Sequence, residues 1–162
     1  MLTRRVVWQG LAVAAATLSA GCARGPQPTP IGVTLNADAG INPNDDGKAS
    51  PVVVRVYELK GLKAFNNAEY FAIMDDEAKA LGDELIASAE YELTPGQQQE
   101  YDRDISAEAT HVGVIAGFRN IQSAKWRDSL QLKQEEKNEF VIFVTSQSVR
   151  IEKLRKRILG VI

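Results

Sequence analysis

The sequence predicts a mainly β fold: a two-sheet antiparallel β-sandwich with a small helical insertion after the second strand. Three observations favour it. Seven or eight short segments alternate apolar and polar residues, turn signals separate these segments, and helical spacing occurs in a single brief stretch. With 162 residues, 44% of them hydrophobic, the chain is long enough for one well-packed domain and too short for two. We assign the sandwich to residues 31–162.

The first two strands are predicted at residues 31–37 and 52–59. In the first, Ile31, Val33 and Leu35 alternate with smaller or polar residues until Gly40 ends the run. The second (VVVRVYEL) is β-branched and aromatic on both faces, which is typical of a central strand. Residues 40–51 between them (GINPNDDGKASP) are rich in turn-forming types and form a surface loop.

Helical spacing follows the second strand. Asn66 or Asn67 is the expected cap of one short helix, and Asp75 or Asp76 the cap of a second helix, which Gly82 ends. Their apolar side chains are expected to cover one face of a sheet. The remaining strands are predicted at residues 85–93, in a polar stretch that reaches 105, and at 111–119, 129–132, 140–145 and 148–154.

Residues 1–21 have the layout of a secretory signal peptide. Arg4 and Arg5 precede an apolar run at residues 6–18, and small residues lead from it to Cys22, the only cysteine. As a helix the run spans about 20 Å, less than the roughly 30 Å hydrocarbon core of a bilayer. Residues 18–22 (LSAGC) resemble the lipobox of bacterial lipoproteins, which implies cleavage before Cys22 and a diacylglyceryl thioether and an N-acyl chain on that residue.

Residues 22–30 are expected to form the lipidated cysteine and a Pro-rich tether. Three of the six prolines lie in ARGPQPTP, which favours polyproline II and can hold a domain up to roughly 25 Å from the lipid. Ala23 stands where Asp is the usual inner-membrane retention signal of Gram-negative lipoproteins. The resemblance therefore implies anchoring at the periplasmic face of the outer membrane.

The composition argues against several functional classes. A net charge of −2 without a basic face is unlike a nucleic-acid binder, and one cysteine with one histidine provides no multi-Cys or multi-His metal cage. His111, the sole imidazole, opens an apolar strand with no nucleophile motif to pair with it. We therefore expect no enzymatic activity, no catalytic residue, no metal, no cofactor and no small-molecule substrate.

The C-terminal end of the chain is basic. Arg150, Lys153 and the run Arg155-Lys156-Arg157 are opposed only by Glu152. These cations either discourage aggregation of an edge strand or attract an anionic surface.

A set of short motifs lies in order behind the lipobox. They are Asn42-Pro43, Gly47, residues 50–59 (SPVVVRVYEL), Phe65, Leu81-Gly82, Thr94-Pro95-Gly96, residues 114–119 (VIAGFR) and Trp126-Arg127. Together they resemble the outer-membrane lipoprotein of the bacterial type VI secretion system, the TssJ family. The resemblance implies a transthyretin-like sandwich that binds the periplasmic C-terminal region of the inner-membrane subunit TssM, and through it is linked to TssL.

The resemblance also implies where the partner binds. The family's partner-contact region is the loop joining the first two strands. On this chain that loop is residues 40–51, and the expected partner-binding residues within it are Asn42, Pro43, Asn44, Asp45, Asp46, Gly47 and Lys48. Two alternatives stay open: a stand-alone periplasmic module that binds glycan or peptidoglycan, and a transthyretin-like hydrolase, although such hydrolases carry several histidines and a Tyr-Arg-Gly-Ser tail.

Overall fold

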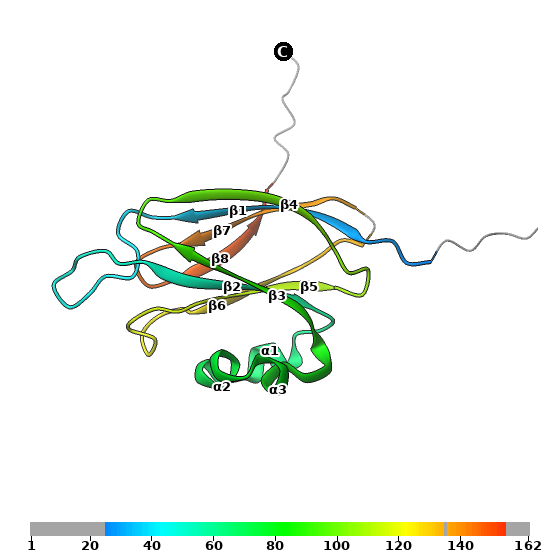
Figure 1. Ribbon diagram of the computed structural model, residues 1–162, viewed down its shortest axis with the longest axis horizontal. Helices are drawn as coiled ribbons and strands as arrows, with labels where there is room; N and C mark the ends of the chain where they lie inside the picture. The colour runs from blue at the N-terminus through cyan, green and yellow to red at the C-terminus, as the bar shows by residue number, and fades with distance from the viewer. Residues whose placement is uncertain (1–24, 135, 155–162) are drawn as a thin grey trace, which may run out of the picture.

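In the computed structural model, which describes residues 25–134 and 136–154, eight strands form two four-stranded sheets packed face to face (Figure 1). Sheet A has the order β4-β1-β7-β8 and sheet B the order β3-β2-β5-β6. The strands are β1 (Thr29–Ala37), β2 (Val52–Leu59), β3 (Leu85–Leu93), β4 (Gln98–Ile105), β5 (His111–Ala116), β6 (Arg127–Gln131), β7 (Asn138–Val144) and β8 (Val149–Lys153). The predicted β-sandwich is confirmed.

One strand pair differs in direction from the expectation. β1 and β7 are parallel, whereas the other pairs among the named strands are antiparallel. β1 also begins at Thr29, two residues inside the predicted tether, because Thr29 pairs with Ile105 at the end of β4. β5 ends at Ala116 rather than at residue 119, and the N–H of Gly117 donates to Val53 O at 2.8 Å.

Strand β2 is buried on both faces. Val52, Val54 and Val56 point between the sheets, where they meet inward-facing residues of β1, β5 and β7 in the main core. Tyr57 and Leu59 point the other way, into a second cluster beneath the helices. The strand thus belongs to two hydrophobic cores, as its two-sided apolar sequence predicts.

A buried ion pair joins the two sheets near the end of β2. Glu58, which is 6% exposed, pairs with Arg103 of β4 and accepts the backbone N–H of Ser106 at 3.2 Å. The carboxylate is thus both charge-paired and hydrogen-bonded, which a buried charge requires.

The helical layer consists of α1 (Lys63–Asn67), α2 (Tyr70–Asp75), α3 (Glu77–Leu81) and the 3₁₀ turn η1 (Gly82–Glu84), which cover the outer face of sheet B (Figure 1). The expected first helix is wrong in its start and its cap, because Asn66 and Asn67 lie inside α1. Extended backbone at Ala68 and Glu69 separates α1 from α2, and Phe65 and Ile73 are both fully buried, one from each helix.

Capping of the helical layer is in part as expected. Asp76 caps α3 by accepting the N–H of Lys79 at 3.0 Å, which confirms one predicted cap. The free backbone N–H groups at the start of α1 are instead bonded by a residue that lies about 20 positions later in the sequence. The carboxylate of Glu84 accepts the N–H groups of Lys63 and Ala64 at 3.2 and 2.8 Å.

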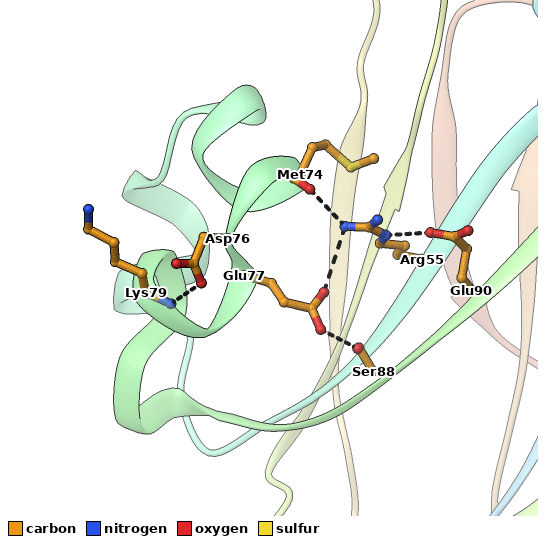
Figure 2. A network of polar contacts seen from close by, with 7 residues as sticks. All are labelled: Arg55, Met74, Asp76, Glu77, Lys79, Ser88 and Glu90. Carbon is orange, nitrogen blue, oxygen red and sulfur yellow. Dashed lines mark hydrogen bonds and ion pairs between the residues drawn. The ribbon is translucent and has the colours of Figure 1, made fainter.

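The Arg55 side chain links sheet B to the helical layer, as Figure 2 shows. Its Nε donates to Glu90 of β3 at 2.7 Å, and its Nη1 donates to Met74 O of α2 at 3.3 Å and lies 3.8 Å from the Glu77 carboxylate of α3. Glu77 in turn accepts the Ser88 hydroxyl at 2.5 Å. One guanidinium therefore connects two strands and two helices, which its planar fork of donors allows.

The contact between the helical layer and sheet B leaves no space for a side chain at Gly113. A Cβ there would lie 2.8 Å from Cζ of Phe65 and 2.9 Å from Cδ1 of Leu59, both of which are buried side chains. Gly113→Ala should lower the free energy of unfolding by about 1–3 kcal/mol through overpacking. In urea denaturation, Gly40→Ala is the matched control, since nothing lies within 4 Å of its Cβ position. Equal stability of the two variants would contradict this packing.

Candidate functional site

Four connections lie at one end of the sandwich, where the N–H of Gly96 in the β3–β4 turn (residues 94–97) donates to Asp38 O at 3.2 Å. Three of the four share one hollow, and we call these three the loop end: the β1–β2 loop (residues 38–51), the β5–β6 loop (117–126) and the β7–β8 turn (145–148). Figure 1 shows the β1–β2 loop, in cyan, projecting from this end. The N–H of Asp38 donates to Val144 O and that of Lys125 to Gln147 O, each at 2.9 Å. These bonds tie both loops to sheet A and the turn that follows it.

Asn42 fastens the β1–β2 loop to its neighbour. The residue is 5% exposed with φ 45°, a left-handed conformation that Asn tolerates better than most residues. Its Nδ2 donates to Pro51 O at 2.7 Å, and its Oδ1 accepts the N–H of Arg119 at 2.8 Å. The side chain therefore closes the base of the loop on itself and joins it to the β5–β6 loop.

Asn44 shapes the tip. Its Oδ1 accepts the backbone N–H groups of Asp46 and Lys48 at 3.1 and 2.8 Å. The N–H of Gly47, whose φ is 74°, donates to Asn44 O at 2.9 Å. Side-chain bonding of this kind is how Asn stabilises tight turns. The backbone of the tip is thus fixed by its own hydrogen bonds.

The tip borders a shallow polar hollow that all three connections share. It is lined by Pro43, Asn44, Asp45, Arg119, Asn120 and Gln147. Asp45, Asp46 and Lys48 are exposed, and so is Arg119 across the hollow. Fixed backbone with exposed charges of both signs is suited to recognising a protein surface, because little conformational freedom remains to be lost on binding.

The seven contact residues predicted from the sequence differ in their exposure. Asp45, Asp46, Gly47 and Lys48 are exposed, whereas Pro43 and Asn44 are half-buried. Asn42 is buried, and its amide is used within the protein. The contact role of all seven stays a prediction. Cys22, the predicted lipid site, lies outside the described residues.

Three residues of this site were not predicted from the sequence: Arg119, Asn120 and Gln147. Their place beside Pro43 depends on how the sheets stack, and that is not encoded in local spacing. One signal was available for Arg119, since it directly follows an apolar strand and ends the motif VIAGFR.

A family model decides what kind of protein this is. The model described as "Type VI secretion lipoprotein, VasD, EvfM, TssJ, VC_A0113" matches residues 29–147, which include β1 to β7, the β1–β2 and β5–β6 loops and the β7–β8 turn up to Gln147. The chain belongs to this family of type VI secretion lipoproteins. A sequence comparison with curated proteins gives no match.

Solved structures agree with the assignment to the type VI secretion lipoprotein family. The T6SS lipoprotein TssJ1 from Pseudomonas aeruginosa is 30% identical with a TM-score of 0.77, over 80% of this chain and 98% of that one. A chain of the "Type VI membrane complex" is 27% identical with a TM-score of 0.67, over 80% and 100%. A chain of "T6SS protein TssM C-terminal domain (869-1107) from EAEC" is 25% identical with a TM-score of 0.65, over 77% and 98%.

The only histidine of this type VI secretion lipoprotein lies away from the loop end. His111 begins β5, whose other end leads into the β5–β6 loop, and its Nδ1 is 2.8 Å from the Thr110 hydroxyl. Burial lowers the pKa of His111 below its ordinary value. Within the described part of the chain, no three His, Cys, Asp or Glu side chains are grouped to hold a metal ion, and no helix is long and apolar enough to cross a membrane.

The Asn42 contacts predict that this side chain stabilises the domain. Asn42→Ala leaves the Arg119 N–H without its acceptor and places alanine at a left-handed φ, so the free energy of unfolding should fall by about 2–4 kcal/mol. Asp45→Ala, at an exposed position of the same loop, should change it by no more than about 0.5 kcal/mol. Chemical denaturation of both variants measures this, and a neutral Asn42→Ala would contradict the role of the side chain.

Proposed function

We propose that this chain is an outer-membrane-anchored lipoprotein of the type VI secretion membrane complex, and that its loop end docks the periplasmic C-terminal region of TssM. TssL is then linked to it indirectly, through TssM. The observation that carries the proposal is membership of the family together with a preorganised, charged loop in the region that the family resemblance implies for partner contact.

A solved structure supports TssM as the partner. The structure of the TssM C-terminal domain from EAEC is named for a TssM segment numbered 869–1107, which is longer than the whole 162-residue lipoprotein. Only 77% of the lipoprotein aligns, and that portion already covers 98% of the matched chain. The matched chain is therefore too short to be the TssM segment. A chain of the present fold in a structure named for that segment favours TssM as the partner.

The direction of β1 supports an anchored docking role. A lipid on Cys22 would lie seven residues before Thr29, where β1 begins, and β1 runs from there to Ala37 and into the β1–β2 loop. Nine residues of strand extend about 30 Å. The lipid would therefore hold one end of the sandwich while the loop end points away from the bilayer. Confinement at a surface raises the effective concentration of the lipoprotein for a partner that reaches the same membrane.

The exposed carboxylates of the tip provide the test of docking. Asp45→Lys with Asp46→Lys should weaken binding of the TssM C-terminal region about 10-fold or more, because charge reversal at an interface opposes complementary charges. The fold should persist, since both side chains are exposed and only the backbone N–H of Asp46 bonds to Asn44. Calorimetry with the purified lipoprotein in non-ionic detergent measures the affinity.

The matched control reverses two exposed acids on the helical layer, Glu69→Lys with Asp83→Lys, and should bind TssM like the wild type. Unfolding by urea confirms that all three proteins are folded. Unchanged affinity of the Asp45/Asp46 variant would remove the tip from the interface.

The anchoring proposal is tested at the thiol. Cys22→Ser removes the nucleophile that a lipid donor needs. In a Gram-negative host that lacks the other secretion subunits, the wild type should fractionate with the outer membrane and the variant with the soluble periplasmic fraction. Three acyl chains exceed what stable anchoring requires, so the shift should be nearly complete. A variant that remains with the outer membrane would refute lipid anchoring at Cys22.

A further inference from the structure

The outer face of sheet A carries a groove that the docking proposal does not use. One cross-strand row runs from Asp102 of β4 through Gly32 of β1 to Glu139 of β7. Leu154 extends the row beyond β8, because its N–H donates to Glu139 O at 2.9 Å. Gly32 has no side chain to fill the middle of the row. These residues line one hollow together with Glu100.

The groove has an excess of negative charge. Glu100, Asp102 and Glu139 contribute carboxylates, and Lys137 is the only cation among the described residues that line it. The Nζ of Lys137 lies 3.3 Å from Asp102 and 3.1 Å from Glu139, so one ammonium is shared by two carboxylates. Glu100 takes no part in that pairing. The lining therefore has room for further cations.

The chain itself supplies cations at this point. Leu154 lines the groove and is 51% exposed, and the next three residues in the sequence are Arg155, Lys156 and Arg157. We propose that the groove on sheet A is the docking site of residues 155–157, whose cations pair with Glu100, Asp102 and Glu139. This inference is independent of the proposed binding of TssM, because the groove lies on the outer face of sheet A and shares no residue with the loop end.

The distances are compatible with this contact. Neighbouring strands are about 4.8 Å apart, so the row from Leu154 to Asp102 crosses three spacings, or about 14 Å. Three extended residues reach about 10 Å, and the long side chains of arginine and lysine cover the remainder. Each exposed ion pair contributes little and is weakened by salt, so the docked segment opens readily at high ionic strength.

Trypsin measures the docking, because it cleaves after each of the three cations. In the purified lipoprotein in non-ionic detergent at low salt, Glu100→Gln with Asp102→Asn and Glu139→Gln should speed the removal of residues 158–162 about 3- to 10-fold, followed by intact mass. The rate tracks the open fraction when opening is fast relative to cleavage. Raising the salt concentration should increase the cleavage rate of the wild type to that of the variant. Cleavage of a free peptide of residues 153–162 under the same conditions corrects for the effect of salt on trypsin itself.

The control variant removes three exposed acids elsewhere, Glu69→Gln with Asp83→Asn and Glu92→Gln, and should be cleaved like the wild type. It matches the change in net charge. Equal cleavage of the wild type and the groove variant at low salt would overturn the proposal. A second outcome would also overturn it: cleavage that slows only when vesicles of phosphatidylcholine and phosphatidylglycerol are added, and slows equally in the wild type and the groove variant. Residues 155–157 would then bind a lipid surface and not the groove.

Discussion

The burial of β2 on both faces is the constraint on which the architecture depends. A strand with valines on one side and Tyr57 and Leu59 on the other cannot leave either face in water without losing a large hydrophobic contribution. Sheet A covers the first face and the helical layer covers the second. Arg55 and the Glu58–Arg103 pair add polar links across the two boundaries. Three layers follow from one strand.

The same strand sets the position of the loop end. β2 begins at Val52, directly after Pro51, whose carbonyl accepts from Asn42. The base of the β1–β2 loop is therefore attached to a strand that is buried on both faces, and Asn42 also joins it to the β5–β6 loop through Arg119. A loop held at its base and hydrogen-bonded within its tip presents charges in a fixed arrangement. A docking surface benefits from this, because a loop that is already ordered loses little conformational entropy when the partner binds.

Sequence reasoning predicted the strands well because residue type and a period of two are both local properties. Val52–Leu59 and the alternation in Leu85–Leu93 needed no knowledge of neighbours. The parallel pairing of β1 with β7 could not be predicted, since alternation is the same in either strand direction. The break between α1 and α2 was missed for a related reason. It coincides with the burial of both Phe65 and Ile73, and burial against a sheet is a tertiary demand that helix propensity does not contain.

In the candidate site, too, local features were predictable from the sequence and tertiary contacts were not. Turn chemistry identified the β1–β2 loop, and Asn44 performs the local bonding that such residues favour. The inward role of Asn42 was not foreseen, because its partner Arg119 is 77 residues away. Arg119, Asn120 and Gln147 reach the same hollow only through sheet stacking. Sequence thus located the loop, and the fold was needed to show which of its side chains are free to meet a partner.

Hydrogen exchange of the lipoprotein with and without the TssM C-terminal region tests the central claim most directly. The account predicts that TssM slows exchange of the backbone amides at the tip and in the facing β5–β6 loop, while amides of the helical layer exchange at unchanged rates. Protection confined to the helical layer, or to the outer face of sheet A, would contradict it.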